Sequence, residues 1–289
     1  MIIARYFILF ILFSVFGWLF ECTYCSIKNG HWSNRGFLYG PLCPIYGSGF
    51  VMAIVIFKIL PIFDNGGVDE PVWEIFLIAL IGSAVLEFTT SYVLEKMFHA
   101  VWWDYSNIPT NIQGRICLPA SCLFGLAGVA IVKFCIPFFD SLPILDESIW
   151  VEIVAMILCL FLGMDLALTV ESLSRITHQL DASQAEFNQR MEENFQNAKD
   201  AGETVVLTAM LKADEAKEKR ESQKQEQEKL RNERIQAIME NLSGMDQYHV
   251  RSIRDYRPSK KKPDQEKLKS FFDEMQKKAE KRQVKKSER

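Results

Sequence analysis

Lysine and arginine are scarce in the first part of this chain, where only seven of the 33 basic residues lie before residue 171. These first residues are mainly apolar, and such a composition excludes an ordinary soluble domain there. The rest of the chain is rich in charge and lacks proline between residues 171 and 242, which is typical of long helices. We therefore predict a transmembrane domain over 1–172, a cytoplasmic helical segment over 173–257, and a basic, disordered or surface-associated tail over 258–289.

Motifs for nucleotide hydrolysis and for common hydrolytic chemistry are also missing. No G-x-x-x-x-G-K-[ST] run is present, so an ATPase would have to be a separate subunit. A nucleophile elbow, an H-E-x-x-H helix and a Rossmann glycine pattern are absent as well. Cys22 and Cys25 have the spacing of half a zinc site, but no second pair and no histidines follow at ligand spacing. We expect no catalytic residue, cofactor or metal site, and therefore no enzyme.

Five apolar segments are long enough to cross a membrane, which takes roughly 20 residues in a helix. Only helices pair all of their backbone groups within one segment, so we predict an all-α, polytopic membrane protein. The first segment is too long for a signal peptide and lacks a small-residue cleavage pattern, so we expect it to be retained. The predicted spans cover about residues 2–22, 41–63, 73–97, 116–139 and 150–170.

The basic residues in the loops predict an orientation. Lys28 and Arg35 lie in the first loop, Lys96 and Arg115 in the third, and the tail is rich in both residue types. The second and fourth loops contain none. Because cytoplasmic loops carry the excess of Lys and Arg, we expect a cell-membrane protein with its N-terminus outside and its tail in the cytoplasm. Only Arg5 opposes this orientation.

One pattern occurs twice in the apolar part. Each copy has a glutamate near the end of one span, a loop with Asn, Gly and Arg, and a second span that closes on Lys, Pro and Asp. Because each copy contains two spans, the copies have the same orientation and form parallel repeats. The matching positions are Glu21 and Glu87, Asn34 and Asn111, Gly36 and Gly114, Lys58 and Lys133, Pro61 and Pro137, and Asp64 and Asp140.

Ionisable groups inside a membrane are costly and tend to be functional, so the repeated positions predict a polar site. The expected site lies near the cytoplasmic side, between the two repeats. Glu87 is its deepest acid, since about ten further residues of the predicted helix follow it. Glu95, eight residues further along on the same face of that helix, is expected to be solvated near the headgroups. The candidate residues are Glu21, Asn34, Arg35, Glu87, Asp104, Asn111 and Arg115.

Two roles remain open for the loop arginines, Arg35 and Arg115. They could clamp a phosphate or a carboxylate, since a guanidinium binds such groups through two hydrogen bonds. They could instead pair internally with Glu21, Glu87 or Asp104. Either role fits a structured vestibule on the cytoplasmic side.

Three runs of this sequence resemble one bacterial family: NRGFLYGPLCPIYGSG, LEFTTSYVLEKMFHAVWWDYSN and NIQGRICLP. The family is Putative ABC-transporter type IV, also described as ABC transporter permeases, and the resemblance covers about residues 10–140. It implies a small multi-pass membrane protein. It transfers no catalytic or binding residue to this chain.

The charged tail has two apolar patches at helical spacing, separated by residues 215–229, which are almost all polar. A sustained coiled coil needs apolar positions over several heptads, so we expect packing against a partner helix or a second copy only at the patches. Basic runs after Pro258 are suited to anionic lipid headgroups, while a solvated tail is equally open. Interleaved acids argue against nucleic-acid binding. The patches are Phe187, Met191 and Phe195, and Ile235, Ile238, Met239 and Leu242; Leu268, Phe271, Phe272 and Met275 form a short apolar face near the end.

The leading hypothesis is a permease-like membrane subunit of a transporter. Its first alternative is a non-transporting scaffold or regulator that acts through the helical tail. The second is a membrane-embedded lipid-modifying enzyme, in which Glu21, Glu87, His31 and His99 would supply acid–base chemistry.

Overall fold

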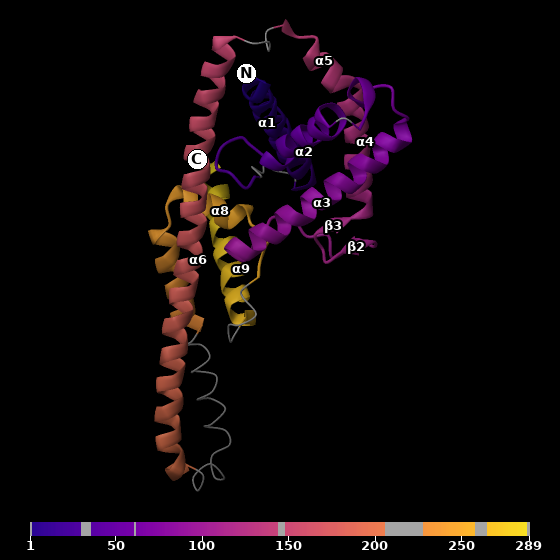
Figure 1. The fold of residues 1–289 in the computed structure, drawn as a ribbon. Coiled ribbons are helices and arrows are strands. Elements are labelled where there is room, and N and C mark those ends of the chain that lie inside the picture. Colours follow the sequence, from indigo (N-terminus) through magenta and orange to yellow (C-terminus); the bar gives the residue numbers. More distant parts are fainter. Residues whose placement is uncertain are drawn as a thin grey trace. The chain divides into compact units, whose positions relative to one another are not determined.

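The computed structural model describes residues 2–29, 36–60, 62–143, 148–205, 228–257 and 265–287. Its described part is mostly helical (Figure 1) and divides into two compact units. Unit 1 contains Met1–Glu171 together with Ser252–Arg257, and unit 2 contains Ser172–Arg251 and Pro258–Arg289. A short segment near the end of the chain therefore belongs to the same unit as the apolar helices.

Unit 1 is built from apolar helices, with shorter helical turns and strands between some of them. Its helices are α1 (Ile2–Asn29), α2 (Pro44–Ile54), α3 (Val72–Phe98), α4 (Leu118–Ala130), α5 (Ile136–Asp140) and the first part of α6 (Ile149–Val205). Between them lie the π-helical turns η1 (Val55–Ile59) and η3 (Ile131–Cys135) and the 3-10 turn η2 (Asp64–Gly67).

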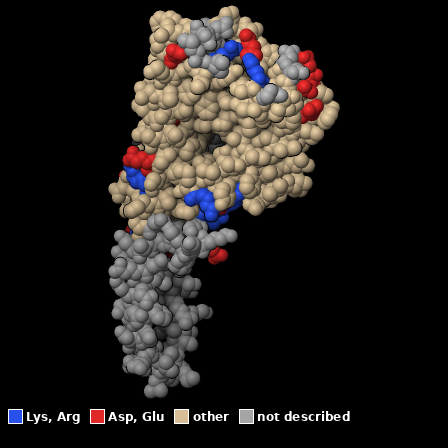
Figure 2. Space-filling model, in the orientation of Figure 1, with Lys and Arg blue, Asp and Glu red and all other residues tan. Residues whose placement is uncertain are grey.

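Four helices in the described residues are long and apolar enough to cross a membrane: Ile3–Ile27, Val72–Phe98, Leu118–Asp140 and Ile149–Leu180. Large apolar side chains on them face outward, with Phe134, for example, 72% exposed. Figure 2 shows the result as a broad surface almost free of charge, with Lys, Arg, Asp and Glu gathered in small groups toward its margins. Such a surface suits a lipid bilayer.

The predicted second span, over about 41–63, is shorter in the structure. Its helix covers Pro44–Ile59, which at about 1.5 Å per residue is roughly 24 Å long. The hydrocarbon core of a membrane is about 30 Å thick. The helix ends because Leu60 adopts an extended conformation with ψ of 135°, as expected for a residue that precedes a proline. A five-span arrangement therefore stays a prediction.

The helices of unit 1 pack mainly as two pairs, α1 with α2 and α3 with α4. Glycine brings the backbones together in both pairs. A Cβ atom at Gly47 of α2 would collide with Phe10 of α1, and one at Gly128 of α4 would collide with Ala79 of α3. Small residues at such crossings are the usual device for close helix packing in membranes.

Replacing Gly128 with alanine is expected to lower the free energy of unfolding by about 2 kcal/mol, because the added methyl group overpacks the contact with Ala79. Gly163 of α6 is the matched control, since no described atom lies within 4 Å of its ideal Cβ position. Gly163→Ala should be neutral or stabilise by up to about 1 kcal/mol through helix propensity. Unfolding of both variants in one detergent tests this; equal stabilities would contradict the close contact.

Apolar side chains from both pairs meet in one core. The rings of Phe13 in α1 and Phe50 in α2 stack with centroids 3.7 Å apart. Phe50 belongs to a buried cluster that also includes Ile75 of α3 and Val132 of η3. The two pairs are therefore held together by apolar packing as well as by the polar contacts described below.

Each pair contains a π-helical turn with a lysine. Lys58 of η1 donates a hydrogen bond to Asp140 at 2.5 Å. Lys133 of η3 donates to the main-chain oxygens of Val68 and Glu70. Asp140 also binds Arg5 at 3.0 Å, so this basic residue near the N-terminus is neutralised within the protein.

Two short antiparallel strand pairs complete unit 1. Strand β2 (Asn111–Ile112) pairs with β3 (Ile116–Cys117) in a hairpin that leads directly into α4. Strand β1 (Ala100–Val101), which follows α3, pairs with β4 (Asp255–Tyr256) from the charged tail. The second pair brings a segment more than 150 residues away back to the membrane domain.

Unit 2 is helical and buries its own apolar side chains. It contains the remainder of α6, helical residues 228–241, α8 (Gly244–Ser252, whose last residue is counted with unit 1) and α9 (Gln265–Ser287). Its buried apolar residues include Leu173, Ile176, Leu180, Ile235, Met239, Leu242, Phe272, Met275 and Ala279. Hydrogen bonds link α9 to residues 228–241, among them one from Arg282 to the main-chain oxygen of Met239 at 2.9 Å.

Within the tail predicted over 258–289 as disordered or surface-associated, residues 265–287 form a helix. Phe272 and Met275 of the predicted apolar face are buried inside unit 2. The patch around Met239 is likewise buried within this chain. The side chains of Phe187, Met191 and Phe195 lie outside the described residues, although α6 includes their positions.

Candidate functional site

Five of the seven predicted site residues lie in the described part of the chain, where they fall into two groups. Asn34 and Arg35 lie outside the described residues. Glu21 and Glu87 lie within α1 and α3, where each binds a tyrosine. The other three, Asp104, Asn111 and Arg115, lie in the loop and hairpin between α3 and α4.

Each helix pair holds one glutamate–tyrosine hydrogen bond. In the first pair, Tyr46 of α2 donates from its hydroxyl to Glu21 Oε1 at 2.5 Å. In the second, Tyr105, in the loop between α3 and α4, donates to Glu87 Oε1 at 3.0 Å. The ring of Tyr46 lies against Gly17 of α1 so closely that a Cβ atom there would collide with it. Local packing therefore fixes the position of the first pair.

Glu87 is the most buried of the predicted acids, with 5% of its surface exposed. Its Oε1 atom accepts the bond from Tyr105, but its Oε2 atom has no hydrogen-bond partner among the described residues. A buried polar atom without a partner costs free energy, and native proteins contain few of them. The open oxygen is therefore the feature of Glu87 that most needs a functional explanation.

The charges of Glu87 and Glu21 both affect the ionisation of the Tyr105 hydroxyl. Burial raises the pKa of Tyr105, and the negative charge of Glu87, with a smaller contribution from Glu21, raises it further. Tyr105 therefore keeps its proton and remains a hydrogen-bond donor to Glu87 at neutral pH. The contribution of Glu21 means that the two acids, one from each helix pair, lie within electrostatic reach of one group.

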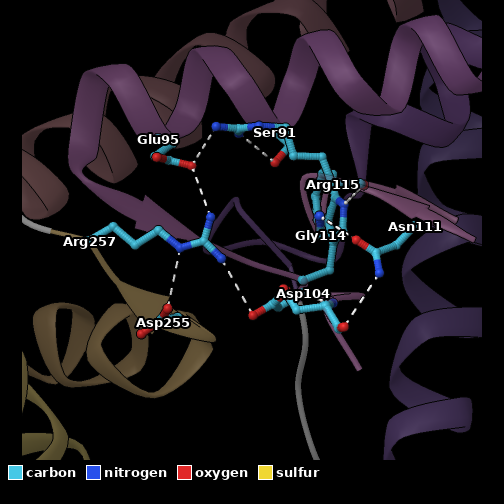
Figure 3. A network of polar contacts seen from close by, with 10 residues as sticks. Ser91, Glu95, Asp104, Asn111, Gly114, Arg115, Asp255 and Arg257 are labelled. Atoms are coloured by element: carbon cyan, nitrogen blue, oxygen red, sulfur yellow. Dashed lines mark hydrogen bonds and ion pairs between the residues drawn. The ribbon is translucent and has the colours of Figure 1, made fainter. Parts of the chain in front are cut away.

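Arg115 is buried and bound on the face of α3 (Figure 3). Its Nη2 atom lies 2.8 Å from Glu95 Oε2, and its Nη1 atom donates to Ser91 Oγ at 3.2 Å. The guanidinium also lies over the rings of Phe88 and Tyr92, with centroid distances of 5.7 and 5.5 Å. Such stacking adds to the ion pair. Arg115 therefore forms an internal ion pair, which is one of the two roles considered for it from the sequence.

The acid that Arg115 binds differs from the three that we expected, Glu21, Glu87 and Asp104. Its partner is Glu95, for which we expected solvation near the headgroups. The side chain of Glu95 is only 24% exposed and contacts two arginines, Arg115 and Arg257. Solvation of Glu95 is therefore a wrong expectation, because the returning tail supplies a second cation that sequence spacing did not reveal.

Asn111 and Gly114 shape the hairpin. Asn111 Oδ1 accepts from the Gly114 amide at 3.0 Å, and Asn111 Nδ2 donates to the main-chain oxygen of Ile108 at 2.7 Å. Gly114 has a φ of +67°, and a Cβ atom there would lie 2.6 Å from Asp104 Oδ1. Only glycine combines this φ with so little space. The Asn and Gly of the second copy of the repeat thus build a turn.

Asp104 joins this hairpin to the tail. Its Oδ1 atom accepts from the Ser106 amide and hydroxyl at 2.9 and 2.5 Å, and its Oδ2 atom lies 3.4 Å from Arg257 Nη2. Partial burial pushes the pKa of Asp104 upward, but the Ser106 hydrogen bonds and the Arg257 charge outweigh it, so the pKa lies below its usual value. The carboxylate is therefore charged at neutral pH.

Sequence reasoning did not include Arg257, Tyr46 or Asp165 among the candidate residues. Asp165 of α6 accepts hydrogen bonds from the amides of Tyr39 and Gly40, both at 3.0 Å. It thereby holds the segment that precedes α2. A lone acid inside an apolar span was a usable signal for Asp165, whereas no local pattern marks Arg257.

These features define a multi-pass membrane protein with buried polar contacts between its helices. The chain belongs to the family Putative ABC-transporter type IV, whose model matches residues 8–170. No curated protein and no solved structure matches the chain. The family match ends at Val170, so it covers most of the four candidate membrane helices and leaves out the whole of unit 2.

Proposed function

We propose that this protein is the permease-like membrane subunit of a transporter, with a polar site between its two helix pairs near the cytoplasmic side. The observation that carries the proposal is the pair of glutamate–tyrosine hydrogen bonds, one in each helix pair, with Glu87 Oε2 left open. Membership of an ABC-transporter family supports a role in transport. A buried acid at an interface between repeats is where transporters commonly bind a solute or an ion.

The two helix pairs support the proposed parallel repeat. In both, glycine brings the helices together, a proline lies in the first turn of the second helix, and a π-helical turn carries a lysine. The lysines are Lys58 and Lys133, which the sequence pattern also matches. Relative motion of such pairs would open and close a site between them.

We further infer five spans, with the helix Pro44–Ile59 as the second, the N-terminus outside and the tail in the cytoplasm. A short span is accommodated by local thinning of the bilayer or by flanking residues. The ion pair between Arg5 and Asp140 supports this orientation, because it neutralises the only basic residue that opposes it.

Energy for transport would come from a separate ATPase subunit, since the chain has no phosphate-binding loop. The proposal gives this chain no catalytic step and no cofactor. Its partners are the lipid bilayer and that ATPase.

The substitution Glu87→Gln should lower transport at least tenfold, while the protein still folds. Glutamine keeps the size of the side chain and an oxygen that accepts the Tyr105 hydrogen bond, but it removes the carboxylate. Transport is measured in proteoliposomes that contain the protein and its co-purified ATPase. The vesicles are loaded with inorganic ions, amino acids and organic cations, and ATP-dependent changes in their contents are followed by mass spectrometry.

Glu74→Gln is the matched control, because Glu74 lies in the first turn of the same helix, α3, and the described residues give it no ion pair. Its transport should equal that of the unmodified protein. A solute that moves equally well with Glu87→Gln would remove Glu87 from the site. An absence of any ATP-dependent movement would contradict the transporter assignment.

A scaffold or regulator acting through the tail is the second candidate, favoured by the pairing of β4 with β1, which ties the tail to the membrane unit. In that case, cells whose protein lacks residues 173–289 should behave like cells that lack the whole protein. Cells that carry Glu87→Gln should behave like cells with the unmodified protein. An unchanged phenotype after removal of the tail would end this alternative.

A further inference from the structure

The loop after α3 offers an open strand edge that a segment of the tail fills. The amide of Arg254 donates to the main-chain oxygen of Val101 at 2.7 Å, and the amide of Arg257 donates to that of His99 at 2.6 Å. Ala100 pairs with Tyr256 in the same ladder. Main-chain bonds of this kind are how an extended peptide adds to a sheet edge.

Side chains fix the position of this segment. Ile253 and Tyr256 are buried, so they provide apolar anchors on either side of the exposed Arg254. Arg257 then reaches two acids of the membrane unit, with Glu95 Oε2 and Asp104 Oδ2 both at 3.4 Å (Figure 3). The segment is thus recognised by backbone pairing, by apolar anchors and by charge.

We propose that the β1 edge, with Glu95 and Asp104 beside it, is a docking surface for an extended segment that carries an arginine, and that Ser252–Arg257 of this chain is its reversible occupant. We name Ser252–Arg257 the strap. The inference goes beyond the proposed function and does not depend on whether a solute is transported.

Release of the strap leaves none of the three charged groups without a partner. Glu95 keeps its shorter contact with Arg115 at 2.8 Å, and Asp104 keeps its hydrogen bonds with Ser106. Arg257 keeps Asp255, at 3.3 Å, within the strap itself. Removing one partner from a buried ion pair is strongly destabilising, so this arrangement avoids the main penalty of undocking.

The charged contacts of the strap are weak individually. The side chain of Arg257 is 31% exposed, and its distances to both acids are longer than that of the Arg115–Glu95 pair. Partly exposed ion pairs contribute little, and a ladder of two residues is marginal. Docking therefore rests on the sum of several modest interactions, which suits a reversible contact.

Occupancy of the docking surface bears on the buried acid. Asp104, which Arg257 binds, directly precedes Tyr105, whose hydroxyl holds Glu87. The strap belongs to unit 1, whereas the residues on both sides of it, up to Arg251 and from Pro258, belong to unit 2. A change in unit 2 that pulls the strap away would loosen the loop that positions Tyr105.

Hydrogen exchange of the full-length protein in lipid nanodiscs tests the proposal. In Arg257→Glu, the amides of Arg254 and of residue 257 should exchange at least tenfold faster, and so should that of Tyr105, which donates to the main-chain oxygen of Gly114. Arg254→Glu is the matched control. It makes the same change in charge on the same segment, but its side chain is exposed and acts on Asp104 only at longer range, without an ion pair in the described residues, so it should accelerate exchange much less than Arg257→Glu.

Raising the salt concentration provides a test on the unmodified protein. Partly exposed pairs are screened as the Debye length falls from about 10 Å at 0.1 M to about 3 Å at 1 M salt. Exchange of the strap amides should therefore rise with salt, while the amides of the β2–β3 hairpin stay protected. Protection of the strap that is unchanged both by salt and by Arg257→Glu would overturn the docking proposal. Faster exchange in the strap with none at Tyr105 would overturn its link to Glu87.

Discussion

Replacing Arg115 with alanine should lower the free energy of unfolding by about 3 kcal/mol, the usual effect of breaking a largely buried ion pair. The guanidinium is the shortest cationic contact of Glu95 and also binds Ser91. Without it, Glu95 retains only the longer contact with Arg257, and Ser91 loses its donor. The stacking over Phe88 and Tyr92 is lost as well. Unfolding of the purified protein in a fixed detergent measures the loss.

Arg115→Lys should be intermediate, because an ammonium keeps the charge but cannot bind Glu95 and Ser91 with one planar group. Lys96→Ala is the control, since Lys96 is an exposed cation on α3, the helix that carries Glu95, and lies over the Tyr92 ring. It should change stability by less than about 1 kcal/mol. If Arg115→Ala and Lys96→Ala were equally stable, Arg115 would not organise this network.

Acidification should destabilise unit 2 by about 2 kcal/mol between pH 7 and pH 5, because His249 is buried there. Burial lowers the pKa of His249 to about 4, against a nearby charge on Asp246 that raises it. The unfolded chain binds a proton near the ordinary pKa of about 6.5, whereas the folded chain does so only near 4. The contribution of neutral His249 to the free energy of unfolding is therefore fully present above pH 6.5 and is lost as the pH falls toward 4.

Exchange of amides in α8 and α9, corrected for the intrinsic effect of pH, measures this change without removing unit 2 from the protein. His249→Phe removes the titrating group and keeps an aromatic ring beside Tyr248, which now contacts the His249 ring. In His249→Phe, the free energy of unfolding of unit 2 should vary much less over the same pH range. An equal pH dependence in both proteins would show that another group causes the acid effect.

The apolar spans and the burial of Glu87 could be predicted from the sequence, because membrane helices must be apolar and an acid followed by more helix cannot reach water easily. Asn111 and Gly114 stood out in the sequence as repeated positions, but their role in a hairpin turn was not predicted. The early end of the second apolar helix also has a local cause, since Leu60 precedes a proline.

The partners of the polar groups could not be predicted in the same way. Arg257 lies 162 residues from Glu95, and its contact depends on the tail folding back to pair β4 with β1. Tyr46 and Tyr105 resemble the interfacial tyrosines of most membrane proteins, so nothing in the sequence marked them as donors to the glutamates. The helix over 265–287 depends on packing against residues 228–241, which its own composition does not reveal.

The most direct test of the proposed site is ATP-dependent solute movement in proteoliposomes that carry Glu21→Gln and Glu87→Gln together. Both substitutions keep an oxygen for the tyrosine that donates to it, Tyr46 or Tyr105, so the protein should retain its fold while it loses both carboxylates. We expect movement to fall to the level of vesicles without the protein, while Glu74→Gln remains fully active. Normal movement in the double variant would contradict a site between the two helix pairs.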